Sequence, residues 1–226
     1  MDSVLRQKAP LVALVAWCVV LLVVRVWYAG NTTYDFMLWN MILAVIPLAA
    51  AWVLRASAAR GGLSAMMVVA FGVWLTFLPN APYMVTDLIH LANRPPVPLW
   101  FDVAFFGSYA ATGVLIGYAA VADVQSVFSA RFGRGVGYAV AVGSLLLCGF
   151  GIYLGRVLHW NSWDVVASPA TLAGQITDRL LDPASHTSAW AVSAIYGVGL
   201  VLGYLALRGI ASAFHDREVG TASSSR

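Results

Sequence analysis

Six runs of mostly apolar residues, each long enough to cross a membrane, limit most strongly how this chain can fold. They cover residues 11–29, 36–54, 61–79, 98–121, 136–157 and 188–207. A membrane-spanning helix needs about 20 such residues, because in hydrocarbon only a helix or a closed barrel satisfies its own backbone hydrogen bonds. Hydrophobic residues fill 61% of the 226 positions and charged residues 10%, unlike a soluble domain. We therefore expect one all-α, polytopic membrane domain over residues 1–226, surrounded by the lipid bilayer.

The basic residues predict the orientation of this domain. Nine of the 13 lysines and arginines lie in the connecting segments 1–10, 55–60, 122–135 and 208–226. Because such residues gather in cytoplasmic loops, we expect both termini inside, 208–226 as a cytoplasmic tail, and segments 80–97 and 158–187 outside. The net charge of +3 does not indicate a nucleic-acid partner, because the basic residues are scattered singly and form no patch.

The third apolar run breaks at Pro79 and Pro82, which cannot donate backbone hydrogen bonds and disrupt a helix interior. If residues 81–94 then form a second helix, its polar side chains share an arc of roughly 120°. This arc consists of Thr86, Asp87, His90, Asn93 and Arg94. We expect it to be a working surface at the outer membrane boundary.

Asp87 and His90 are three residues apart, a spacing that suits a metal pair or a carboxylate that orients an imidazole. His159, Asp164 or His186, from the other outer segment, would complete a divalent-metal site, since catalytic zinc takes about three protein ligands. The motif D-x-x-H is short, and the alternative is a polar helix face in water. In that alternative Asp87 pairs with an arginine, Arg94 or Arg156.

A second polar group lies at the outer end of the fifth apolar run and contains Arg156, His159, Trp160, Asn161, Trp163 and Asp164. A guanidinium four residues before an indole can stack on it, and arginine suits contact with a phosphate or carboxylate. The alternative is an ion pair from Arg156 to Asp164 or Asp87. Because an unpaired charge at a membrane boundary is costly, we expect the two polar groups to meet, with Asp87 and His90 against Arg156 and Asp164.

Three further features bear on the fold. The segment 168–183 predicts an amphipathic outer helix with Ser168 as N-cap and Pro169 at its first position, lying over the site as a lid. Glycine pairs with G-x-x-x-G spacing occur in the fourth, fifth and sixth runs and predict close helix packing. Arg25 lies about one turn from the outer boundary, where we expect it to extend to the interface; a counter-ion role is the alternative.

Two stretches, FLPNAPYMVTDLIHL at 77–91 and GIYLGRVLHWNSWD at 151–164, resemble the signature segments of an uncharacterised bacterial membrane-protein family, domain of unknown function 1361. The similarity extends from the second apolar run to the last. It implies a multi-pass protein of the bacterial inner membrane. It brings no substrate, cofactor or catalytic residue with it.

Two function classes remain open from the sequence. In the first, an enzyme acts on a lipid or an anionic lipid-linked head group, with His90 as base or metal ligand, Asp87 orienting it, and Arg156 binding the head group. In the second, a non-catalytic scaffold or small-solute carrier uses the same residues as a structural cluster. A carrier is expected to show ionisable residues near mid-membrane or repeated broken spans, and neither is evident in the sequence.

The predicted orientation can be tested by labelling single cysteines from outside the cell in a variant without Cys18 and Cys148. We expect labelling near Asn93 and Ala184 and none at Ser57 or Ser129, because the last two lie in segments predicted to be cytoplasmic. The reverse pattern would contradict the orientation.

Overall fold

Helices make up most of the chain in the computed structural model, which describes residues 2–61, 64–92 and 94–224, and the side chains from Lys8 to Phe214 within them. The five longest helices are α1 (Asp2–Ala29), α2 (Phe36–Ala59), α5 (Leu99–Phe132), α6 (Arg134–Leu158) and α9 (Thr187–Ser224). The described residues contain six helical stretches long and apolar enough to span a membrane. The predicted all-α, polytopic fold is therefore confirmed.

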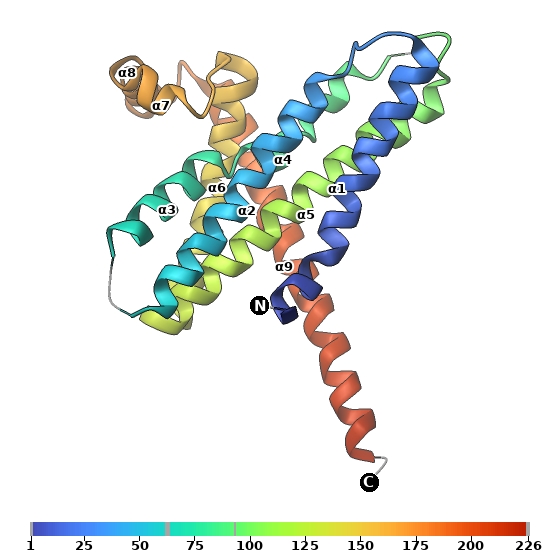
Figure 1. Ribbon diagram of the computed structural model, residues 1–226. Helices are drawn as coiled ribbons and strands as arrows, with labels where there is room; N and C mark the ends of the chain where they lie inside the picture. Colours follow the sequence, from blue (N-terminus) through green and yellow to red (C-terminus); the bar gives the residue numbers. More distant parts are fainter. Residues whose placement is uncertain (1, 62–63, 93, 225–226) are drawn as a thin grey trace.

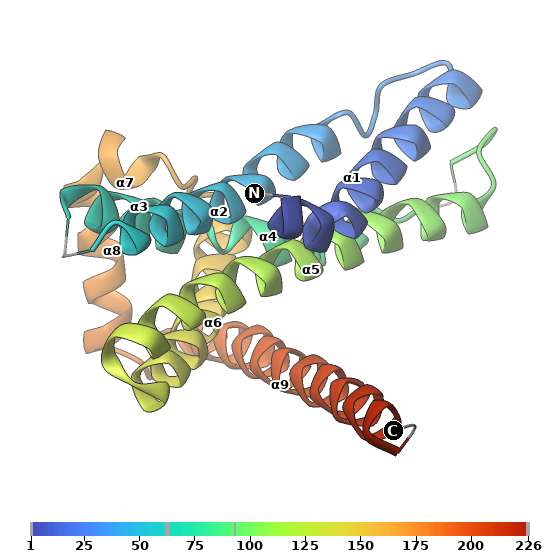
Figure 2. The ribbon, with the colours of Figure 1, turned by 60° about the horizontal axis from the view of Figure 1, so that its bottom comes forward.

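The spans form two connected groups (Figure 1). Helices α1, α2 and α5 run side by side, and α6 packs against both α5 and α9. Figure 2 shows α9 on the other side of α5 from α1 and α2. Helices α7 (Asp164–Ala167) and α8 (Pro169–Leu181) lie beyond the C-terminal end of α6. The amphipathic helix predicted within 168–183 is thus present, with Ser168 as N-cap and Pro169 at its start.

Two helices extend further than predicted, α5 into a predicted loop and α9 into the predicted tail. Residues 122–132 continue α5, so that only Gly133, with a φ of +93°, separates α5 from α6. Glycine suits this position because L side chains rarely adopt positive φ. Helix α9 continues to Ser224, through most of the segment 208–226 that the sequence assigned to a tail.

The third span differs most from its prediction. Helix α3 (Ala65–Phe77) has 13 residues and is about 20 Å long, too short to cross a hydrocarbon core of about 30 Å. The short helix α4 (Asn80–Tyr83) and the 3₁₀ helix η1 (Thr86–His90) complete a stretch of 26 residues, Ala65–His90. The single α-helix predicted over 81–94 is therefore wrong, and the proline break falls within the apolar stretch Ala65–His90.

Asn80 satisfies part of the backbone that the break leaves free. The N–H of Ala81 donates to the carbonyl of Leu78, so the carbonyl of Phe77 lacks its usual helical donor. The side-chain Nδ2 of Asn80 donates to that carbonyl over 2.9 Å. Asn80 thus replaces one of the hydrogen bonds that the break removes. At membrane depth such irregular backbone also needs protein around it.

Helix α5 covers one side of the break through its glycine pair, Gly113 and Gly117. A Cβ atom at Gly113 would overlap the carbonyl oxygen of Ala81, and one at Gly117 would lie 3.2 Å from the Cβ of Ala81. Any side chain at Gly113 would therefore push α4 away from α5.

Helix α6 covers the opposite side with a second glycine pair, Gly151 and Gly155. A Cβ atom at Gly151 would lie 2.5 Å from Cγ of Pro79, and one at Gly155 would lie 3.0 Å from Cε2 of Tyr83. The two pairs thus hold the broken segment between two continuous helices. This close contact is the packing role that the glycine spacing predicted for the fourth and fifth runs. In the sixth run a Cβ atom at Gly203 would overlap the Tyr118 hydroxyl, but one at Gly199 would meet nothing within 4 Å.

This arrangement predicts different effects for two alanine substitutions on α5. Gly113→Ala should lower the free energy of unfolding by about 1–3 kcal/mol, the usual cost of overpacking, because the new methyl meets backbone of α4. Gly107→Ala, where a Cβ atom meets nothing within 4 Å, should be neutral or stabilise by up to about 1 kcal/mol. Reversible unfolding in detergent measures both. Equal effects would show that α4 does not depend on the contact.

Candidate functional site

An ion pair joins the broken third span to α6. Arg156 Nη2 lies 3.3 Å from Oδ1 of Asp87 and also donates to the backbone carbonyl of Thr86. Asn40, on α2, donates from Nδ2 to Oδ2 of the same carboxylate over 2.8 Å. The predicted contact between Asp87 and Arg156 is confirmed. Three spans therefore meet at one buried carboxylate.

The polar arc predicted for residues 86–94 does not face water as a unit. Thr86 and Asp87 are buried, whereas Leu88 and Ile89 point outward, with Ile89 70% exposed. The reason is the 3₁₀ geometry of η1, whose three residues per turn place side chains differently from the 3.6 of an α-helix. Asn93, the fourth member of the arc, lies outside the described residues.

His90 lies at the end of η1, partly buried beside α2. Its ring meets that of Phe36 edge-on at 5.3 Å, and its backbone carbonyl accepts a hydrogen bond from the Tyr34 hydroxyl over 3.1 Å. The Tyr34 ring in turn lies 4.0 Å from the guanidinium of Arg25 and 5.6 Å from that of Arg94. His90 is thus held by aromatic and backbone contacts.

Arg25 forms a second buried ion pair. Its Nε lies 3.0 Å from Oδ1 of Asp102, and the two side chains are 2% and 0% exposed. The expectation that Arg25 extends to the membrane interface is wrong, and the alternative counter-ion role is correct. Burial of both charges follows from their pairing, because an isolated charge in this environment is costly.

The three remaining candidates, Asp164, His159 and His186, lie apart from the Asp87–Arg156 pair, and Nε2 of His186 lies 3.2 Å from Oδ2 of Asp178 on α8. Asp164 accepts a hydrogen bond from the backbone N–H of Asn161 over 2.7 Å, at the start of α7. His159 ends α6 with a φ of 60° and is exposed. In the described part of the chain, no three His, Cys, Asp or Glu side chains gather as a metal-binding group, so Asp87, His90 and His159 do not form one.

The predicted stacking of Arg156 on Trp160 is also not found. The guanidinium of Arg156 lies 5.3 Å from the ring of Tyr83 instead. The indole Nε1 of Trp160 donates to Oε1 of Gln175, on α8, over 2.9 Å. The left-handed turn at His159 ends α6 three residues after Arg156, so Trp160 does not occupy the next helical turn above Arg156.

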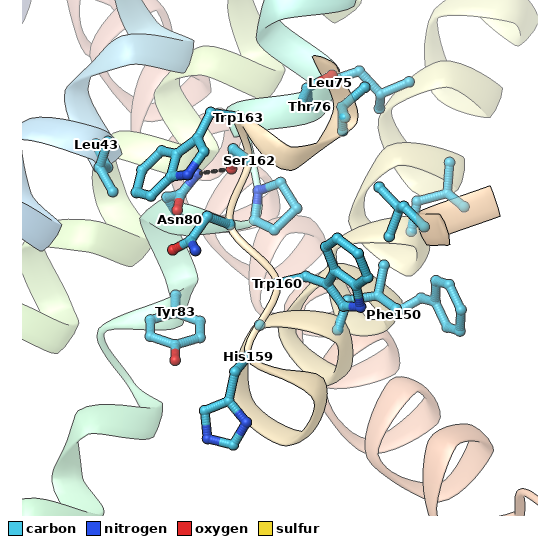
Figure 3. A pocket seen from close by; sticks show the side chains of 18 of the residues that line it. Leu43, Leu75, Thr76, Asn80, Tyr83, Phe150, His159, Trp160, Ser162 and Trp163 are labelled. Carbon is cyan, nitrogen blue, oxygen red and sulfur yellow. Dashed lines mark hydrogen bonds between the residues drawn. The ribbon is translucent and has the colours of Figure 1, made fainter. Parts of the chain in front are cut away.

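A pocket of about 460 Å³ lies where α2, α3, α4 and α6 meet the segment 159–176. Figure 3 shows Trp163 beside Asn80 and Ser162, with Trp160 near Phe150. Asn80 Nδ2 donates to Oγ of Ser162 over 2.7 Å and so ties this segment to the third span. Much of the remaining lining is apolar and includes Leu43, Leu75, Leu147 and Phe150.

The pocket and the Asp87–Arg156 pair share two wall residues. Asn40 and Tyr83 line the pocket, and they also contact the carboxylate of Asp87 and the guanidinium of Arg156 respectively. Neither charged side chain is among the described lining residues. The ion pair therefore lies behind the wall and holds it in place.

Helix α8 covers part of the pocket with Leu172 and Ile176. Two polar contacts connect it to the bundle: the Trp160–Gln175 bond, and Arg179 Nε, which donates to the hydroxyl of Tyr153 over 3.2 Å. The lid position predicted for this helix agrees with these contacts.

Sequence reasoning missed the contribution of α2 to the site. Asn40 is a lone amide inside an apolar run, with Trp39 beside it. The signal was available, because a polar side chain within a span usually faces the interior of a bundle.

The sequence matches the family described as "Protein of unknown function (DUF1361)" over residues 39–202. The chain belongs to this family. The match covers the broken third span, the pocket and both segments that carried the resemblance. No curated protein and no solved structure matches the chain.

Alanine substitution of three aspartates should lower the free energy of unfolding by different amounts. Asp102→Ala leaves Arg25 buried and unpaired and should lower the free energy of unfolding by about 3–5 kcal/mol. Asp87→Ala should cost less, about 1–3 kcal/mol, because Arg156 is partly exposed and retains the Thr86 carbonyl. Asp164→Ala should cost about 0.5 kcal/mol or less. Chemical denaturation in detergent tests the order, and a larger loss for Asp164→Ala than for Asp87→Ala would contradict it.

Proposed function

We propose that this protein binds a lipid in the pocket between the broken third span and α6, at the outer face of a bacterial cytoplasmic membrane. The lipid head group would lie against Asn80, Asn161 and Ser162. Its hydrocarbon chains would lie along the apolar lining.

The observation that carries this proposal is the gradient of polarity along the pocket. Asn161 and Ser162 follow the end of α6, whereas Leu147 lies 11 residues before that end, about 16 Å along the helix axis. Leu43 lies seven residues into α2, about 10 Å from its start. A pocket that is polar at a membrane boundary and apolar toward the membrane interior suits an amphipathic molecule.

Lipid binding by the pocket is better supported than catalysis in which Asp87, His90 and Arg156 act on a substrate. A general base or nucleophile must come within about 3 Å of the reacting group. Asp87, His90 and Arg156 are absent from the described lining, and Arg156 is engaged by Asp87 and Thr86. In this proposal they position Asn40 and Tyr83 and do not contact the lipid directly.

A structural scaffold is the second candidate. Its support is that the buried charges pair internally, at Arg25 with Asp102 and at Asp123 with Lys8 and Arg55. Such pairs fix the arrangement of the helices whether or not a ligand binds. The pocket is the feature that a scaffold leaves unexplained.

The proposal predicts that filling the pocket removes bound lipid. Thr76→Trp places an indole in the lining, whereas Val73→Trp places it on the same helix at a position that is 38% exposed and outside the lining. After extensive detergent washing, wild type and Val73→Trp should retain a lipid by native mass spectrometry. Thr76→Trp should retain roughly tenfold less, as expected when a ligand loses about 1.4 kcal/mol.

Two controls make the result decisive. Both variants must give the same helical content and elution volume as wild type, so that unfolding does not explain the loss. Equal lipid in Thr76→Trp and Val73→Trp would overturn the binding proposal and favour the scaffold.

A further inference from the structure

We propose that the pocket selects a neutral glycosyl head group, so that its ligand is a glycolipid and not an anionic phospholipid. This inference rests on the proposed function and specifies the ligand class. It departs from the anionic head group that Arg156 suggested in the sequence.

The first line of support is the lack of charge in the lining. Among the lining residues that the structure describes, none is Asp, Glu, Lys or Arg, and the imidazole of His159 points away from the other labelled side chains in Figure 3. The nearby Arg179 is engaged by Tyr153, Gln175 and Asp178. A phosphate commonly relies on arginine, lysine or a helix N-terminus, whereas a sugar requires no charge.

The second line of support is the set of aromatic faces. The rings of Trp39 and Trp163 lie 6.4 Å apart at an interplanar angle of 61°, and both line the pocket. Trp160 is held by Gln175, and Tyr83 is held by the guanidinium of Arg156 at 5.3 Å. Aromatic faces carry partial negative charge, which suits the polarised C–H groups of a sugar ring. Rings held in place also lose little conformational entropy on binding.

The third line of support is the kind of polar group beside these rings. Asn80, Asn161 and Ser162 line the same part of the pocket, and Asn40 lies across from them on α2. An amide or hydroxyl can both donate and accept hydrogen bonds, as the hydroxyl groups of a sugar do. A phosphate, by contrast, only accepts at its ionised oxygens. The lining therefore matches a hydroxyl-rich, uncharged group.

The test is a lipid competition in nanodiscs. Discs would contain equal amounts of phosphatidylcholine, phosphatidylglycerol and monoglucosyl diacylglycerol, and purification would avoid glycoside detergents, because these carry the same head group. Native mass spectrometry would then measure the lipid retained by the full-length protein. Wild type should retain the glucolipid over phosphatidylglycerol by about tenfold, a difference of about 1.4 kcal/mol.

Two pairs of variants test the residues. Trp163→Ala should lower glucolipid retention at least about fivefold, whereas Trp27→Ala, which removes an exposed tryptophan of α1 outside the lining, should not. Asn161→Arg adds a cation to the lining and should shift retention toward phosphatidylglycerol. The same change at Asn31, outside the pocket, should not shift it.

The outcomes separate this inference from the function on which it rests. Preference of wild type for phosphatidylglycerol, or equal retention by Trp163→Ala and Trp27→Ala, would overturn the glycosyl inference and leave lipid binding in place. If wild type retains no more lipid than Thr76→Trp does, both the lipid-binding proposal and the glycosyl inference are overturned. A soluble disaccharide that competes as well as its alkyl glycoside would show that the ligand is a free sugar, which would overturn the glycolipid assignment.

Discussion

The structure depends on one requirement of the membrane interior: backbone without helical hydrogen bonds must be covered by protein. Pro79 and Pro82 create such backbone inside the third span, and three kinds of neighbour cover it. The α5 glycines allow close approach on one side, the α6 glycines on the other, and the side chain of Asn80 bonds the free Phe77 carbonyl. The pocket exists because this irregular segment does not fill its layer as a straight helix would.

The ion pairs extend the same arrangement outward. Asp87 can be buried in η1 because Arg156 and Asn40 reach it from two other spans. Tyr34 then links this region to the Arg25–Asp102 pair through the His90 carbonyl and the Arg25 guanidinium. A buried ion pair contributes little net stability compared with apolar packing of the same volume. Removing one partner, however, strongly destabilises the protein, because the other charge is left buried and unpaired. Such pairs therefore favour one arrangement of the spans over others.

Much of the fold could be predicted from the sequence because its signals are local. Apolar runs identify spans, and Pro169 marks the start of α8. The contact between Asp87 and Arg156 was predictable because few partners exist for a charge at that depth. The burial of Arg25 with Asp102 was not, because choosing between the interface and the interior requires knowing which helices are neighbours. The 3₁₀ turn at Thr86–His90 was missed for a similar reason, since its geometry is set by the covering helices and no local motif marks it.

The short α3 also affects how the chain enters the membrane. At 13 residues it is shorter than an independent span, and the remainder of the Ala65–His90 stretch contains the prolines and Asp87. Some of the groups that compensate for these residues are already present, in Asn40 on α2 and Asn80 itself, whereas the glycines of α5 and α6 and Arg156 come later in the chain. Arg156 follows Asp87 by 69 residues, so the ion pair of Asp87 can form only after most of α6 has been synthesised.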